Sequence, residues 1–174
     1  MVILGSTVNR TRLMRIVLAA VFLALCVVGA NVKLMGSIAL DSFAAFLGAI
    51  VLGPVDGAVL GFFGHMISAL LAGFPLTLPI HLIIGVLMAI CMAAFGYIRK
   101  RFGRDKLSVI LVSDVIAYVI NVPLELVLMY PLLKGTIVAF FLPLTIATIV
   151  NLVICEILYK IFAKRLAPFM GDVK

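Results

Sequence analysis

The sequence predicts an all-α integral membrane protein, because the chain is far too apolar for a soluble domain. Of its 174 residues, 66% are hydrophobic and 12% are charged, and the mean hydropathy is +1.36. Soluble domains carry roughly 25% charged residues. A spanning helix needs about 20 apolar residues, so the chain has room for six spanning helices and short connections. We therefore expect one transmembrane domain over residues 1–174, surrounded by the lipid bilayer.

Three apolar runs are easy to delimit as helices, at residues 13–32, 107–130 and 137–162. Another run, residues 40–98, is too long for one crossing. It is interrupted at Gly53-Pro54 and by a turn at residues 73–79, and three helices fit between these breaks. The first of the three, residues 41–52, covers only about 18 Å, so a short span and half of a re-entrant pair both stay open.

The basic residues predict the orientation of these helices. Of the 14 lysines and arginines, 12 fall in three clusters, and such clusters stay in the cytoplasm. The other two, Lys33 and Lys134, fall in connections that this orientation places outside. We therefore expect both termini in the cytoplasm. The clusters are Arg10, Arg12 and Arg15; Arg99, Lys100, Arg101, Arg104 and Lys106; and Lys160, Lys164, Arg165 and Lys174.

The composition and motifs argue against other classes of protein. The net charge of +7 comes from clusters that membrane orientation already requires, so we expect no nucleic-acid partner. The sequence has no GxxxxGKS or GxxxxGKT loop, no GxSxG and no HExxH, which predicts a protein that is not an enzyme. The three cysteines form no CxxC, and we expect neither a cofactor nor a metal. A metal role for His65 and His81 is a weaker alternative.

Ionisable residues inside apolar runs are the strongest functional signal. Asp41, His65 and His81 interrupt residues 40–81, which are otherwise almost wholly apolar. A charge at the bilayer centre costs about 2.5–3.5 kcal/mol on insertion scales, so such groups usually face a cavity, a partner or water. For His65, simple packing inside the bundle is as good an interpretation as ligand contact.

The run at residues 107–130 supplies a second set of polar groups. Asn121 and Glu125 lie on one helical stripe with Asp114 and Tyr118, and Pro123 predicts a kink between them. We expect a ligand site at the outer face, where Asp41, His81 and Glu125 converge beside Asn121 and the aromatic residues Phe43, Phe74 and Tyr130. In the last helix, Thr148 and Asn151 are interpreted as hydrogen-bond partners between helices.

Small residues predict close contacts between helices. Ala20 and Ala24 are four apart in the first helix, and Gly57 and Gly61 have the same spacing in the third. Such spacing lets helix backbones approach closely in lipid. Contacts within the chain explain both patterns, and an external helical partner for one of the two surfaces stays open.

These features resemble the substrate-binding S components of energy-coupling factor (ECF) vitamin transporters. The resemblance covers essentially the whole chain. It rests on the Ala20-x-x-x-Ala24 pattern and on the block from Leu40-Asp41-Ser42-Phe43 through Gly53-Pro54 and Gly73-Phe74-Pro75-Leu76 to His81. Within this family the chain is most similar to the α-ribazole branch. It departs from the pattern at Ala44, where many relatives have proline, so the start of the second helix is expected to be looser.

The resemblance implies a six-helix bundle in the bacterial cytoplasmic membrane with both termini inside. It implies capture of a vitamin precursor from outside, and inward delivery with a T subunit and two ATPase subunits, which would contact the face of Ala20 and Ala24. Carried over to this sequence, the ligand contacts are Asn31, Asp41, Phe43, His81, Asn121, Glu125 and Tyr130, with His65 a less secure member.

The pocket predicted from these residues suits a neutral nucleoside. Its flat ring would stack on Phe43, Phe74 or Tyr130, and its ribose hydroxyls would donate to Asp41 or Glu125. Two alternatives stay open: an S component for another vitamin or a cobalamin-related compound, and a stand-alone membrane enzyme.

Overall fold

The structure, a computed structural model, describes residues 3–35 and 38–170, and helices dominate it. Its α-helices are α1 (Ile3–Gly29), α2 (Phe43–Val51), α3 (Pro54–Leu71), α4 (Leu78–Phe102), α5 (Leu107–Val119), α6 (Glu125–Leu133) and α7 (Val138–Leu166). A π-helical turn, η1 (Ile120–Leu124), joins α5 directly to α6, and the 3-10 turns η2 (Lys134–Ile137) and η3 (Ala167–Phe169) flank α7. Two short antiparallel strands, β1 (Lys33–Met35) and β2 (Ile38–Ala39), connect α1 to α2.

The helices confirm the predicted all-α membrane architecture. By length and composition, four helical stretches of the described chain are able to cross a membrane: Arg12–Gly29, Pro54–Leu71, Leu78–Phe102 and Leu107–Phe169. The last stretch contains α5, η1, α6 and α7, so the count of six crossings stays a prediction. The β1–β2 hairpin was not predicted, because its strands are too short to show an alternating pattern.

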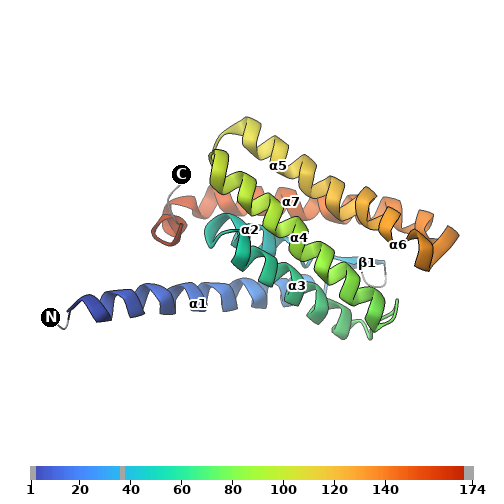
Figure 1. Cartoon of the computed structure of the whole chain (residues 1–174), viewed down its shortest axis with the longest axis horizontal. Helices are drawn as coiled ribbons and strands as arrows, with labels where there is room; N and C mark the ends of the chain where they lie inside the picture. Colours follow the sequence, from blue (N-terminus) through green and yellow to red (C-terminus); the bar gives the residue numbers. More distant parts are fainter. Residues whose placement is uncertain (1–2, 36–37, 171–174) are drawn as a thin grey trace.

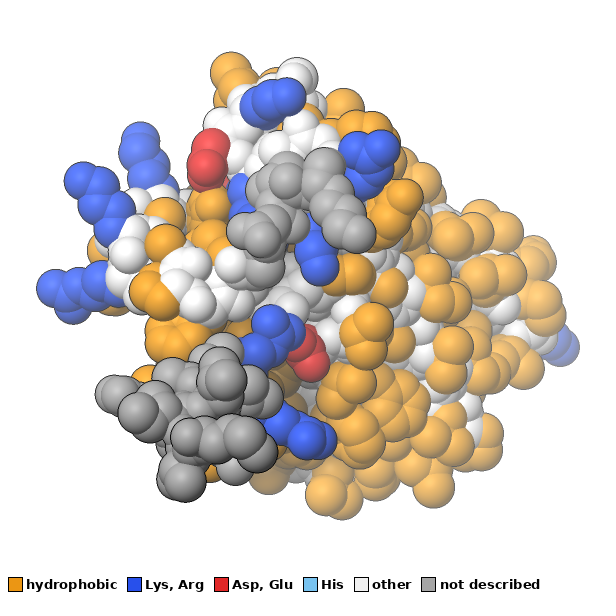
Figure 2. All heavy atoms as spheres, turned by 60° about the vertical axis from the view of Figure 1, so that its left-hand side comes forward, with side chains coloured by type: hydrophobic (Ala, Val, Ile, Leu, Met, Phe, Trp, Pro, Cys, Tyr) orange, Lys and Arg blue, Asp and Glu red, His pale blue; other side chains and the backbone are white. Residues whose placement is uncertain are grey.

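Charge is concentrated at one end of the molecule. Figure 1 shows the start of α1, the turn between α4 and α5 and the end of α7 at the same end, which we call the basic end. Figure 2 brings this end forward and shows Lys and Arg side chains gathered on it, while hydrophobic side chains cover the flank. The β1–β2 hairpin and the end of α6 lie at the opposite end (Figure 1).

Helix α2 is a short central element enclosed by the others. Its nine residues span only about 14 Å, and all of them after Phe43 are buried among α1, α3, α4 and α7. A helix that is apolar all round, as α2 is, is expected in such surroundings. Gly57 of α3 lies directly against Ala49 of α2, so a side chain there would collide with it.

Two arginines donate hydrogen bonds to backbone carbonyls at the end of α2. Pro54 begins α3 and has no N–H, so the carbonyl of Ile50, four residues earlier, lacks its helical donor. The Nε of the buried Arg104 donates to this carbonyl at 3.2 Å. Arg15 of α1 donates to the carbonyl of Leu52 at 2.6 Å and pairs with Asp56 at 2.7 Å. The predicted break at Gly53-Pro54 is thus stabilised by side chains from two other parts of the chain.

The two small-residue patterns have different environments. In α3, Gly57 packs against α2 and Gly61 against Met88 and Met92 of α4, so this pattern serves contacts within the chain. In α1, Ala20 and Ala24 are exposed. Of the two surfaces, the α1 surface is therefore the one left open to an external helix.

Candidate functional site

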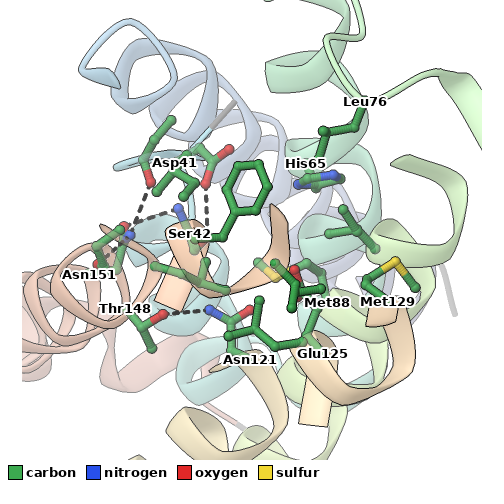
Figure 3. A pocket seen from close by; sticks show the side chains of 18 of the residues that line it. Asp41, Ser42, His65, Leu76, Met88, Asn121, Glu125, Met129, Thr148 and Asn151 are labelled. Carbon is green, nitrogen blue, oxygen red and sulfur yellow. Dashed lines mark hydrogen bonds between the residues drawn. The ribbon is translucent and has the colours of Figure 1, made fainter. Parts of the chain in front are cut away.

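A cavity at the end opposite the basic end gathers most of the buried polar groups. Its volume is about 70 Å³, below the roughly 300–1,000 Å³ typical of small-molecule sites, so the pocket is narrow in this structure. Its polar lining consists of Asp41, Ser42, His65, Asn121, Glu125, Thr148 and Asn151 (Figure 3). Its apolar lining consists of Ile38, Ala39, Leu76, Ile84, Met88, Leu126, Met129, Leu133, Ile137, Phe140, Leu144 and Ala147. We refer to this cavity as the pocket.

Asn151 of α7 fixes one wall of the pocket. Its Oδ1 accepts hydrogen bonds from the backbone N–H groups of Ser42 and Phe43 at 3.1 and 2.8 Å. Its Nδ2 donates to the carbonyls of Ala39 and Ala147 at 3.3 and 2.9 Å. The first N–H groups of a helix have no partner within it, and here a side chain from another helix satisfies those of α2. With both donors and both lone pairs in use, Asn151 positions the wall and has no capacity left for a ligand.

Asp41 lies on this wall, just before α2. Its side chain is buried, and its Oδ1 accepts a hydrogen bond from the Ser42 hydroxyl at 2.8 Å. Burial raises the pKa of the Asp41 carboxyl above its ordinary value of 3.8. The carboxyl is therefore held in the pocket with unused hydrogen-bonding capacity.

The π-helical turn η1 presents Asn121 to the pocket, and the start of α6 presents Glu125. Pro123 lies within this turn and lacks an N–H, which explains why regular α-helical bonding is interrupted there. Asn121 Nδ2 donates to Thr148 Oγ1 at 2.7 Å, so the Asn121 carbonyl oxygen is unused. Among the described residues, none donates a hydrogen bond to the buried Glu125 carboxyl. The predicted kink is thus found between these two residues as a π turn.

The side chains of His65 and His81 contact each other. His65 lines the pocket, whereas His81 is fully buried behind it, with His65 Nε2 and His81 Nδ1 3.2 Å apart. The Leu76 N–H points at His81 Nε2 across 3.5 Å, so in neutral rings His81 Nδ1 carries the proton and donates to His65. Within the described chain, no group of three metal-binding side chains includes this pair.

The loop before α4 is held against this pair under backbone strain. Phe74 packs against His81 with 5.7 Å between ring centroids. Phe74 and Thr77 adopt positive φ values of 50° and 75°, a conformation that costs non-glycine residues on the order of 1–3 kcal/mol. Leu76 lies between them and lines the pocket (Figure 3). The histidine pair therefore connects the pocket to a strained loop.

The pocket brings together some of the predicted contacts and leaves others outside. Asp41, His65, Asn121 and Glu125 line it, while Phe74 and His81 support His65 from behind. Five predicted residues are not among its lining residues: Phe74 and His81, which lie behind it, and Asn31, Phe43 and Tyr130. Asn31 is exposed and donates to the carbonyl of Val27 at the end of α1. Tyr130 is 59% exposed, and Phe43, the first residue of α2, packs against the core.

The sequence interpretation missed several lining residues. Thr148 and Asn151 were correctly interpreted as hydrogen-bond partners between elements, but not as part of the pocket wall. Ser42 and the apolar residues Met88, Met129 and Phe140 were not singled out. The spacing of Met129, four residues after Glu125, is the signal that places it on the same face.

Comparison with known protein families agrees with this geometry. A family model described as ECF-type riboflavin transporter, S component, matches residues 10–168, which is nearly the whole chain. Neither a curated protein nor a solved structure gives a significant match. The family is one of transport proteins and not an enzyme class, and the apolar helices agree with a multi-pass membrane protein. The predicted transporter family is thus confirmed at the level of S components: this chain belongs to the family of ECF-type riboflavin transporter S components.

Proposed function

We propose that the chain captures a flat, nitrogen-containing heteroaromatic compound with a hydroxylated side chain, and that α-ribazole is this substrate. The observation that supports this proposal is the composition of the pocket, in which an apolar wall faces a set of hydrogen-bonding groups. Sites for small organic ligands typically combine a mainly apolar lining with a few polar groups that set the orientation.

The polar groups match the hydroxyls and the ring nitrogen of a nucleoside. Asp41 and Glu125 would accept hydrogen bonds from ribose hydroxyls, and the remaining Asn121 N–H would donate to the imidazole nitrogen of the base. Because Phe43 and Tyr130 do not line the pocket, the ring contacts would come from Phe140 and the thioethers of Met88 and Met129.

Riboflavin is the second candidate, because the matching family carries its name. Riboflavin and α-ribazole share a dimethyl-substituted benzo ring fused to a nitrogen heterocycle, and both carry a five-carbon hydroxylated unit. The same polar and apolar walls therefore suit either compound, and direct binding measurements separate them.

The proposal includes partners and topology. The chain would cross a bacterial plasma membrane six times, with the basic end and both termini in the cytoplasm, as the clustered Lys and Arg side chains favour. A T subunit would contact α1 at the exposed Ala20 and Ala24, and two ATPase subunits would supply energy. The loaded subunit would reorient against the T subunit and release its ligand inward.

Titration calorimetry on the purified full-length protein tests the site. We expect α-ribazole to bind, and Asp41→Ala and Glu125→Ala each to weaken its binding about 10- to 100-fold, because each leaves a buried ligand hydroxyl without its acceptor. Tyr130→Ala is the control, since Tyr130 is 59% exposed and outside the lining, and it should leave the affinity unchanged. Unchanged affinity in both acid variants would remove these carboxyls from the site.

A further inference from the structure

The pocket contains acids but no cation. Its ionisable lining residues are Asp41, His65 and Glu125, and its described lining includes neither Lys nor Arg. Asp41 and Glu125 are each only 6% exposed, so bulk water screens them poorly. Figure 3 shows these groups around one hollow, with Asp41 and Asn151 on one side and His65 and Leu76 on another.

Backbone donors do not compensate for the missing cation. A helix N-terminus attracts anions through its free N–H groups, and α2 begins at the pocket wall. The N–H groups of Ser42 and Phe43 are already bound to the Asn151 side chain, and both Asn151 donors bind backbone carbonyls. The best anion-binding feature beside the pocket is therefore used by the protein itself.

Three arginines that form hydrogen bonds inside the fold are bound away from the pocket. Arg99 lies against Glu156 on α7, and Arg104 and Arg15 hold the carbonyls at the end of α2. The basic residue with an electrostatic effect on Asp41 is Lys33, whose side chain is exposed on β1. Recruiting any of the three arginines into the pocket would break a bond that supports the fold.

We infer that the pocket selects by charge: it accepts uncharged or cationic ligands and excludes phosphate esters. A phosphate group entering the pocket would lose its hydration and meet two carboxyl groups without a cation to pair with, which is unfavourable whether or not the carboxyls carry protons. The inference rests on the proposed function of the pocket as the substrate site. Where the external source is a nucleotide, hydrolysis of its phosphate monoester must come before uptake.

Calorimetry with matched ligand pairs tests this selectivity on the full-length protein. The pairs are α-ribazole with its 5′-phosphate, and riboflavin with flavin mononucleotide. We expect the phosphorylated member of whichever pair binds to be at least about 100-fold weaker, since its charge is buried without a partner. A phosphate ester that binds within about threefold of its parent compound would overturn the inference.

The outcomes separate the inference from the proposed function. If riboflavin binds, α-ribazole does not and flavin mononucleotide is rejected, the proposed substrate is wrong and the charge selection stands. If α-ribazole and its phosphate bind equally, the substrate stands and the charge selection is wrong. Mass spectrometry of compounds retained through purification decides the matter if neither pair binds: a phosphorylated compound overturns the inference, and an uncharged or cationic one supports it.

A variant that removes one pocket acid gives a second measurement of the preference for unphosphorylated ligands. Glu125→Gln keeps the shape of the side chain but removes an acid from the pocket, so it should narrow the preference for the unphosphorylated ligand about tenfold. Asp56→Asn is the matched control, because it also replaces a carboxyl by an amide, in the first turn of α3, where Asp56 pairs with Arg15 outside the pocket lining. An unchanged preference in Glu125→Gln, or an equal change in Asp56→Asn, would contradict selection by the pocket acids. If Glu125→Gln does not fold, the wild-type ligand pairs still decide.

Discussion

The two ends of this protein bury charged groups in opposite ways. At the basic end, Arg99 is fully buried and donates to both carboxylate oxygens of Glu156 at 2.7 and 3.2 Å, with the rings of Phe95 and Tyr159 beside it. At the pocket end, Asp41 and Glu125 are also buried. The Ser42 hydroxyl donates to Asp41 at 2.8 Å, whereas no described side chain donates to Glu125.

The charges at the basic end are bound within the fold, whereas the pocket acids are the ones that we propose contact a ligand. A buried polar group is costly unless it is hydrogen-bonded, and a buried charge is costly unless it is paired. The basic end pairs its buried cations within the chain, through Arg99–Glu156 and through the bond of Arg104 to Ile50, although Arg99 Nε and Asp114 Oδ1 have no hydrogen-bond partner there. The pocket end leaves acceptors unused around a hollow. Under the proposed function, the ligand would supply the missing hydrogen-bond donors.

The largest expected effect is at the basic end. Arg99→Ala would leave Glu156 largely buried without its partner, and removing one member of a buried pair costs about 3–5 kcal/mol. We expect a matching loss in the free energy of unfolding, measured by thermal or denaturant unfolding in detergent. Replacing both residues, as in Arg99→Met with Glu156→Met, should recover most of the loss, because no charge is then left unpaired.

The Arg15–Asp56 pair serves as the control, because it is an exposed ion pair whereas Arg99–Glu156 is largely buried. Its side chains are 38% and 42% exposed, and exposed pairs contribute about 0–1 kcal/mol. Asp56→Ala should therefore lower the stability by no more than about 1 kcal/mol, while Arg15 keeps its bond to Leu52. Equal losses in Arg99→Ala and Asp56→Ala would show that the basic end does not depend on buried pairing.

An intermediate effect is expected at the pocket wall. Asn151→Ala removes four hydrogen bonds and leaves the N–H groups of Ser42 and Phe43 without a partner, which should cost about 2–3 kcal/mol. Hydrogen exchange at these two amides should speed up more than exchange in the middle of α2. Thr148→Val, which removes one hydroxyl from the same helix, should cost about 1 kcal/mol and leave those amides protected. Equal protection in both variants would rule out Asn151 as the group that holds α2.

Much of the fold was predictable because apolar runs and helix-breaking residues determine where helices begin and end from the local sequence. The break at Gly53-Pro54 predicted the end of α2, and the turn at residues 73–79 predicted the loop before α4. The packing of α2 at the centre was not predicted, because an apolar run has the same composition whether it faces lipid or protein. Its short length was the available sign.

Site residues were predictable where a polar residue interrupts an apolar run. They were less predictable where the prediction depended on which face of a helix a residue occupies. Asp41, Asn121 and Glu125 were found because they interrupt apolar runs. Tyr130 lies outside the pocket lining because it is one residue, about 100° of helix, beyond Met129, which does line the pocket. Phe140 was missed because a single aromatic residue in an apolar helix carries no signal of its own. Depth in the membrane was a weaker guide than the face of the helix.

Because Asp41 is buried at the pocket wall, we expect the stability of the protein to depend on pH. Burial raises the pKa of Asp41 in the folded protein above 3.8, so below this ordinary value the carboxyl is neutral in both states and its burial has no charge penalty. As the pH rises, the unfolded chain loses its proton first, and the wild type should lose stability until the folded pKa is passed. Asp41→Asn has no proton to lose there, so its stability relative to wild type should rise with pH, by up to about 1.4 kcal/mol for each pH unit in this window. Unfolding of both proteins between pH 4 and 8 measures the slope. A difference between Asp41→Asn and wild type that is constant over this range would mean that Asp41 titrates as an exposed carboxyl, and the contrast between the two ends would then rest on Glu125 alone.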